Sequence, residues 1–146
     1  MTQTYHSANE AKTEIFGARI AAHSKNLSAI ALSGELGAGK TALVRGLAQA
    51  LGCRDAVSSP TYAIVNEYRG GERKVCHFDL YRLSGSDALW EIGWQDYLDS
   101  GALCVVEWSE VAPDLFPKAT LRAKIEITGE NTRLITVDWP EGIELC

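Results

Sequence analysis

The sequence contains no block of lysine and arginine, and its overall charge is acidic. Nineteen Asp and Glu outnumber fourteen Lys and Arg, which gives a formal net charge of −5. A chain with this charge has no general attraction to the phosphate backbone of nucleic acids. It also lacks an apolar segment long enough to cross a membrane, and its N-terminal residues lack the basic flank and apolar core of a signal peptide. These absences disfavour direct nucleic-acid or membrane binding, and we expect an untargeted cytoplasmic protein.

Cysteine and histidine are scarce and scattered, so the sequence offers neither a disulfide framework nor a metal-binding motif. The cysteines, none in a C-x-x-C pair, and the histidines are Cys53, Cys76, Cys104, Cys146, His6, His23 and His77. We predict reduced thiols and hydrogen-bonded or solvated histidines. No repeat or linker divides the 146 residues, which predicts a single domain over residues 1–146.

Residues 34–41, GELGAGKT, match the phosphate-binding pattern G-x-x-x-x-G-K-[ST], the Walker A loop. An apolar run at residues 30–32 predicts a strand before the loop, and apolar residues at helical spacing predict a helix after it. Glycines let successive N–H groups turn toward an anion. We expect Lys40 to reach the outer phosphates and the Thr41 hydroxyl to bind Mg²⁺. The predicted nucleotide-binding residues of the loop are Gly37, Ala38, Gly39, Lys40, Thr41 and Ala42.

The remaining pattern predicts a three-layer α/β fold of the P-loop NTPase type with a mixed, partly antiparallel sheet. Ser7 and Glu10 have the spacing of a capping box, and residues 8, 11, 15, 18 and 22 are expected to form the apolar face of the helix that follows. Further predicted elements are a strand near residue 5, an antiparallel hairpin of strands 62–69 and 74–83, a helix over 86–98, a buried strand over 102–106, and a final hairpin of strands 121–127 and 134–137.

Two carboxylates are candidates for hydrolysis, which a Walker A loop alone does not perform. Asp79 shares one strand face with His77; alternatively, it only pairs with Arg82 or a turn amide. Glu107 ends the most apolar strand, where P-loop proteins place a metal-binding acid; alternatively, it is a surface carboxylate. Trp108 follows and is expected near the pocket, although tryptophans more often serve a core or an interface.

One further candidate lies in the final hairpin. Arg133 is a candidate contact to the purine end of the nucleotide, or a solvated strand arginine.

Several segments together resemble one family, the TsaE (YjeE) P-loop ATPases, which take part in making threonylcarbamoyladenosine on tRNA. The similar segments are GELGAGKT at 34–41, Arg45-Gly46, SSPTY at 58–62, HFDLYRL at 77–83, Ile92-Gly93 with Asp96-Tyr97, and VEWSE at 106–110. They cover most of the chain from about residue 32 to residue 110, and HFDLYRL together with EWSE is more specific than the Walker loop. Residues beyond Val111 are similar only loosely.

The resemblance implies a bacterial Mg-dependent ATPase that works in a complex with TsaB and TsaD. TsaD modifies the tRNA in that family, so this chain would meet tRNA only through the complex. The family motifs make Thr41 and Glu107 the Mg²⁺ ligands and add Asp79 and Lys40 to the catalytic residues. Thr61 would lie in a switch loop near the γ-phosphate, and slow hydrolysis would be activated by the partners.

This sequence departs from the family pattern at two positions. Ala42 stands where the family commonly has a second threonine, so that hydroxyl contact is missing. Glu35 replaces the usual aspartate and keeps its charge.

Two other functions remain open. A small-molecule or nucleotide kinase also uses a Walker A loop, but it needs an arginine-bearing lid, and the arginines of the middle of the chain, Arg69, Arg73 and Arg82, fall in or beside the predicted hairpin. A nucleotide-dependent binding module would bind ATP without cleaving it. A GTPase is disfavoured because no N-K-x-D segment is present.

Overall fold

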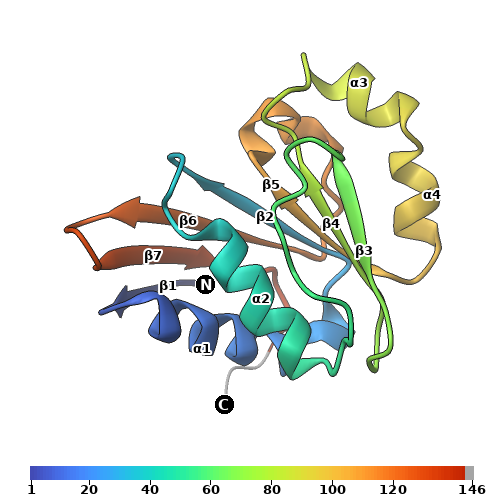
Figure 1. The fold of residues 1–146 in the computed structure, drawn as a ribbon. Helices are drawn as coiled ribbons and strands as arrows, with labels where there is room; N and C mark the ends of the chain where they lie inside the picture. The colour runs from blue at the N-terminus through green and yellow to red at the C-terminus, as the bar shows by residue number, and fades with distance from the viewer. Residues whose placement is uncertain (144–146) are drawn as a thin grey trace.

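The computed structural model describes residues 1–143, which form a mixed sheet between two layers of helices (Figure 1). The elements are β1 (Thr2–Ser7), α1 (Glu10–Ala21), β2 (Ala29–Gly34), α2 (Lys40–Ala50), β3 (Val65–Tyr68), β4 (Val75–Asp79), α3 (Ser86–Glu91), α4 (Trp94–Asp99), β5 (Leu103–Glu107), β6 (Thr120–Ile127) and β7 (Arg133–Asp138), with short 3₁₀ turns at Ser24–Asn26, Ser109–Val111 and Pro113–Leu115. The predicted α/β architecture is confirmed.

The seven strands follow the order β1-β7-β6-β2-β5-β4-β3. Strands β6, β2, β5 and β4 run parallel. On one side β7 pairs antiparallel with β6 and with the edge strand β1, and on the other side the edge strand β3 pairs antiparallel with β4. Strands β2, β4 and β5 are buried along nearly their whole length, as expected for parallel strands covered on both faces, whereas β6 alternates buried and exposed residues. Parallel strands end at the same edge of the sheet, so the ends of β2, β4 and β5 lie side by side there.

Helices α1 and α2 cover one face of the sheet and cross at very short range (Figure 1). Two glycines permit this approach. A Cβ atom on Gly46 would lie 1.8 Å from the Glu14 carbonyl oxygen, and one on Gly17 would lie 2.1 Å from that of Leu43. The crossing fixes α2, and with it the loop that precedes α2.

Helices α3 and α4 cover the other face, where their buried side chains pack on β4 and β5. The predicted helical segment 86–98 is helical except at residues 92 and 93, where it divides into two helices. The chain adopts a left-handed conformation at Gly93, with φ of 93°, which ends α3 and lets α4 start in a new direction. Trp94 at that start packs edge-on against Phe78 of β4, with ring centroids 5.3 Å apart.

The start of α1 also differs from the prediction. Asn9 is the N-cap residue, and its side chain accepts a hydrogen bond from Lys12 N. The Ser7 hydroxyl instead donates to Asn9 O and contacts Thr13 Oγ1 at 2.7 Å. The predicted apolar face was therefore wrong: the buried face comprises Thr13, Phe16, Gly17, Ile20 and Ala21, whereas Ile15 is 46% exposed.

Strand boundaries were overextended around the first hairpin. Residues 61–63 form a turn, so β3 begins only at Val65, and β4 ends at Asp79 rather than at Leu83. Of the predicted reduced cysteines, Cys53, Cys76 and Cys104 are free thiols, and Cys146 lies outside the described residues. Among the described residues, no helix has the length and apolar character needed to cross a membrane.

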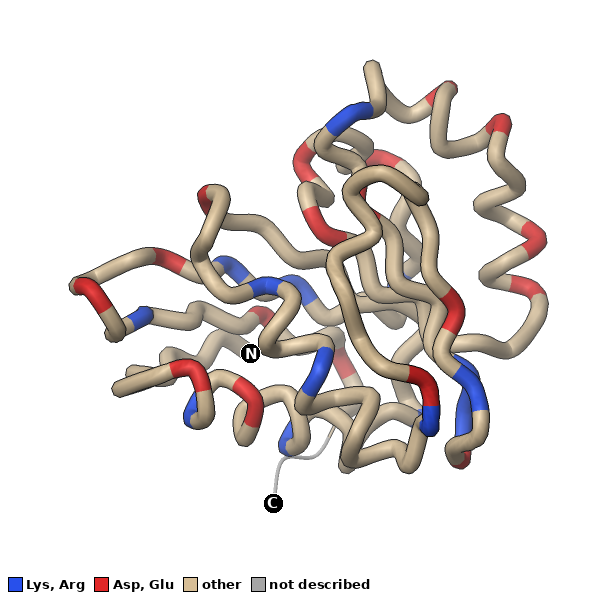
Figure 2. The backbone as a smooth tube through the Cα atoms, viewed as in Figure 1, with Lys and Arg blue, Asp and Glu red and all other residues tan. Residues whose placement is uncertain are grey.

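Acidic and basic residues are distributed unevenly over the two helical layers (Figure 2). No Lys or Arg occurs between Arg82 and Lys118, the part of the chain that contains α3 and α4. That layer therefore offers no cationic surface to a phosphate backbone.

Candidate nucleotide site

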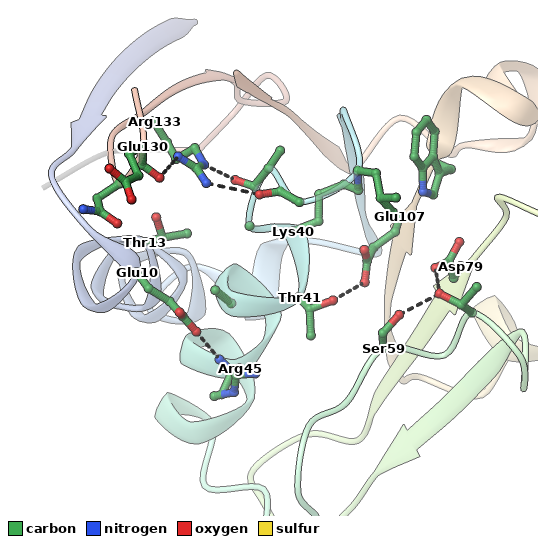
Figure 3. A pocket seen from close by; sticks show the side chains of 18 residues that line it. Glu10, Thr13, Lys40, Thr41, Arg45, Ser59, Asp79, Glu107, Glu130 and Arg133 are labelled. Atoms are coloured by element: carbon green, nitrogen blue, oxygen red, sulfur yellow. Dashed lines mark hydrogen bonds and ion pairs between the residues drawn. The ribbon is translucent and has the colours of Figure 1, made fainter. Parts of the chain in front are cut away.

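A cavity of about 430 Å³ lies at the carboxyl ends of β2, β4 and β5 (Figure 3). It is bounded by the Walker loop, the start of α2, the loop before β3 and the β6–β7 hairpin. The structure brings every predicted site residue to this one cavity: Gly37, Ala38, Gly39, Lys40, Thr41, Ala42, Thr61, Asp79, Glu107, Trp108 and Arg133. Their roles toward a ligand stay predictions.

The Walker loop joins β2 to α2, as the sequence predicts. Gly37 and Gly39 have φ of 80° and 104°, a conformation that side-chain-bearing residues rarely adopt. Gly39 is the N-cap of α2, so the unpaired N–H groups and positive dipole end of this helix face the cavity. This arrangement favours an anion.

Lys40 is folded back along the loop. Its ammonium donates to the carbonyl oxygens of Gly34 at 2.5 Å and Glu35 at 3.0 Å, and lies 4.2 Å from the centre of the Trp108 ring. Burial lowers the pKa of Lys40, while the negative charges of Glu107, Glu110 and Asp79 oppose that shift. The two carbonyls hold the cation at the wall of the cavity, where a phosphate oxygen would compete for it.

The two carboxylates end neighbouring strands. Asp79 and Glu107 are register partners in β4 and β5 and are 3% and 4% exposed. Asp79 Oδ2 accepts from Thr61 Oγ1 at 2.8 Å, and Oδ1 accepts from the backbone N–H of Tyr81 at 2.9 Å. The turn-amide alternative for Asp79 is thus partly right, whereas Arg82 lies over the Tyr62 ring instead.

Glu107 is not the surface carboxylate of the alternative reading, because it is buried among polar partners. Its Oε2 accepts from Thr41 Oγ1 at 3.1 Å and lies 2.5 Å from His77 Nε2. Trp108 follows with φ of 58°, and this left-handed turn aims its indole over Lys40. The Ser109 hydroxyl donates to Leu32 O at 3.1 Å and ties the turn to β2.

Thr41 and Glu107 are suited to a magnesium ion. Mg²⁺ prefers oxygen ligands and, beside a nucleotide, takes only one or two from the protein. The Thr41 hydroxyl and the Glu107 carboxylate offer such oxygens within hydrogen-bonding distance of each other. Residues 1–143 contain no group of three His, Cys, Asp or Glu side chains able to hold a metal ion by themselves.

Arg133 braces the Walker loop from the β6–β7 hairpin. Its guanidinium donates to Ala38 O at 3.0 Å and Gly37 O at 3.2 Å, and to the hairpin carbonyl of Gly129 at 3.1 Å. The half-exposed guanidinium therefore has protein partners as well as access to solvent, and the predicted purine contact stays a prediction.

Sequence reasoning missed several residues that line or support the cavity. These are Glu10, Thr13, Arg45, Ser59, Glu130 and Asn131 at its walls, and His77 with Tyr68 behind Glu107. Arg45 Nη1 pairs with Glu10 Oε1 at 3.0 Å, which links α2 to α1 beside the cavity. The Arg45-Gly46 pair in the family resemblance was the one signal for this contact.

The chain is similar to known proteins of one family. A family model described as Threonylcarbamoyl adenosine biosynthesis protein TsaE matches residues 7–142. The tRNA threonylcarbamoyladenosine biosynthesis protein TsaE of Haemophilus influenzae is 39% identical over 71% of this chain and 66% of its own length, just under two thirds. The Bacillus subtilis protein of the same name is 33% identical over 90% of this chain and 82% of its own.

The fold agrees with a solved structure as well. The crystal structure of Bacillus subtilis YdiB superposes with a TM-score of 0.76 at 28% identity, covering 94% of this chain and 84% of that one. The family match over most of the described residues and the relatives above 30% identity lead to one conclusion: the chain belongs to the TsaE family of threonylcarbamoyl adenosine biosynthesis proteins.

Proposed function

We propose that this chain is the ATP-binding and ATP-hydrolysing component required for N6-threonylcarbamoyladenosine modification of tRNA, acting in a complex with TsaB and TsaD. One observation carries the proposal: a single cavity joins a Walker loop to two buried carboxylates that end adjacent strands. The names of the relatives support the pathway.

The Walker loop and Lys40 would bind the phosphates. The N–H groups at the start of α2 are directed at an anion, and Lys40 would exchange its two carbonyl acceptors for phosphate oxygens. Thr41 and Glu107 would hold Mg²⁺, which neutralises phosphate charge when bound. Ala42 contributes only its backbone, since it lacks the hydroxyl of the common family threonine.

Asp79 is the candidate to orient the attacking water. Its carboxylate accepts from Thr61, which lies in the loop before β3, so both residues face the same part of the cavity. An ionised carboxylate accepts a hydrogen bond from water and draws its oxygen toward phosphorus. Glu107 is held by Thr41 and His77 and suits a metal ligand better than a base.

The loop beside the cavity supports the proposal of partner dependence. Ser59 and Thr61 line the cavity from a loop with few backbone hydrogen bonds to the sheet. A partner that orders this loop would exclude water and raise turnover. The net charge of −5 gives no direct attraction to tRNA, which supports contact with tRNA only through the complex in the cytoplasm.

The kinase alternative is weakened by the arginines of the hairpin region. Arg73 donates to the carbonyl oxygens of Ser24, Leu27, Gly101 and Ala102, a structural task. Arg69 pairs with Asp55. Of the described arginines, only Arg45 and Arg133 line the cavity, and both already have partners.

Nucleotide titration combined with phosphate release tests the proposal. We expect Mg-ATP to bind and to be cleaved slowly to ADP and free phosphate, and Asp79→Asn to keep binding while losing cleavage. Transfer of phosphate to a small acceptor would favour a kinase. Binding without any cleavage, alone or with TsaB and TsaD, would favour a binding module.

A further inference from the structure

A chain of hydrogen bonds runs from the Walker helix through the sheet to the loop before β3. Thr41 Oγ1 donates to Glu107 Oε2, which lies 2.5 Å from His77 Nε2. His77 Nδ1 lies 2.8 Å from the Tyr68 hydroxyl, whose oxygen lies 2.9 Å from Ser58 O and accepts from Ser58 N at 3.3 Å. Three elements, α2, β5 and β4, are thereby connected through β3 to residue 58.

The middle of this chain is sealed from solvent. His77 is 0% exposed, Tyr68 2% and Glu107 4%. Buried polar groups that lose a partner cannot turn to water instead, so a movement of one of them is passed to the next. Among the described residues, no buried side-chain nitrogen or oxygen lacks a hydrogen-bond partner, so each buried group of this network is engaged.

The Tyr68 hydroxyl has one hydrogen and two possible acceptors, which links its two hydrogen bonds to each other. Burial raises the pKa of Tyr68, so its hydroxyl keeps its single hydrogen. That hydrogen serves either Ser58 O or an unprotonated His77 Nδ1, but not both. Which of the two acceptors it bonds depends on which nitrogen of His77 carries a hydrogen. The contact of Nε2 with the Glu107 carboxylate therefore affects the bond at Nδ1.

The loop at the far end is held mainly by side chains. Thr61 contacts Ser59 Oγ at 2.8 Å and donates to Asp79, while Asn66 Nδ2 donates to Ser58 O at 3.2 Å. The loop closes at Ile64, whose φ of 72° is unfavourable for a β-branched residue. A segment with this strain and so few backbone bonds responds readily to a change at one of its attachment points.

We propose that His77 and Tyr68 are positioning residues that couple the Glu107 carboxylate to the loop of residues 57–64, so that Mg-nucleotide binding at Glu107 reorders the loop through the core. The inference rests on the proposed function, since it requires a Mg-nucleotide in the cavity. It gives His77 a role that neither phosphate binding nor water orientation supplies.

Hydrogen exchange with and without Mg-ATP tests the coupling, comparing wild type with Tyr68→Phe. Tyr97→Phe is the matched control, because Tyr97 is half-buried against Phe78 and its hydroxyl makes no hydrogen bond to described residues. In wild type and Tyr97→Phe, Mg-ATP should slow exchange in segments 37–43 and 57–64. In Tyr68→Phe, segment 37–43 should still slow, while the response of 57–64 should fall by roughly fivefold, the factor for one lost hydrogen bond.

The wild type gives a second test that needs no variant. ATP with a chelator should slow exchange at 37–43 and leave 57–64 nearly unchanged, because no cation then acts on Glu107. Full loop protection by Mg-ATP in Tyr68→Phe would overturn the coupling and assign the effect to direct contact of Ser59 or Thr61 with nucleotide. No protection at 37–43 in wild type would overturn nucleotide binding itself, and with it this inference.

Discussion

At the scale of single residues, the site depends on side chains that are already engaged before any ligand arrives. Lys40 is held by two loop carbonyls and by the Trp108 ring, and Glu107 is held by Thr41 and His77. Each group is thus placed near its proposed working position without being free to move far. A phosphate or a cation would replace one existing contact of a side chain that is already ordered, which lowers the entropic cost of binding.

Replacing Lys40 by alanine should weaken Mg-ATP binding about 10- to 100-fold, since a hydrogen bond to a charged group contributes roughly 1.5–3 kcal/mol. Isothermal titration would measure the change. Lys124→Ala, which removes an exposed lysine of β6 paired with Glu126, is the control and should bind normally. An unchanged affinity in Lys40→Ala would mean that residues 34–41 do not hold the phosphates.

Asp79→Asn and Glu107→Gln should both lose ATP turnover by about 100-fold or more, the usual contribution of a positioned catalytic group, while remaining folded. Only Glu107→Gln should also weaken the dependence on Mg²⁺. Phosphate release at several Mg²⁺ concentrations measures both effects, with Glu91→Gln on exposed α3 as the control. A fully active Asp79→Asn would reduce Asp79 to a structural partner of Thr61.

Predicting these residues from sequence succeeded where the signal is local. The spacing of residues 34–41 identifies the loop, and Glu107 is found because it ends the most apolar strand. His77, Tyr68 and Glu10 were not assigned to the site, because their contacts depend on strand register and on a helix crossing rather than on neighbours in the chain.

At the scale of elements, the close crossing of α1 and α2 positions the Walker helix. Gly46→Ala should destabilise the protein by about 1–3 kcal/mol despite the better helix propensity of alanine, because its Cβ would meet the Glu14 backbone. Denaturant unfolding measures this, and Gln49→Ala on the exposed side of α2 is the control. Equal stability of Gly46→Ala and wild type would show that the two helices separate freely.

Two buried free thiols, Cys76 of β4 and its register partner Cys104 of β5, predict a loss of stability at high pH. Burial raises the pKa of Cys76 to about 11 and that of Cys104 to about 12, above the ordinary 9.0. Between pH 9 and 11 the folded state therefore binds more protons than the unfolded state, so the free energy of unfolding falls as pH rises. By pH 10.5 the loss should be about 2 kcal/mol for each thiol.

Unfolding at pH 8 and pH 10.5 checks this prediction. The double variant Cys76→Ala, Cys104→Ala should lose less stability between the two values than wild type, whereas Cys53→Ala should lose nearly as much. Parallel losses in all three proteins would assign the alkaline effect to other groups.

Element boundaries were predicted less well than element types. The N-cap of α1 moved from Ser7 to Asn9 because two competing cap residues lie close together, and the tertiary contact of Ser7 with Thr13 decided between them. The helix over 86–98 broke at Gly93, where packing of Trp94 into the core favours a change of direction. Neither preference is visible in apolar spacing alone.

At the scale of the whole molecule, the order of sequence patterns along the chain predicts the fold class. A Walker loop after a short apolar strand, a second apolar strand ending in an acid and hairpins at the edges predict a mixed sheet with helices on both faces, and the structure has that sheet. The strand order could not be predicted, because it depends on long-range pairing such as that of β6 with β2.

Partner activation is the central claim, and ATP hydrolysis with and without TsaB and TsaD tests it most directly. Wild type and Thr61→Ala would be assayed for phosphate release from Mg-ATP, each alone and in the mixture. We predict slow release by isolated wild type, clear stimulation by the two partners, and loss of most of that stimulation in Thr61→Ala, because Thr61 anchors the loop to Asp79. Release by isolated wild type as fast as in the mixture would contradict the account.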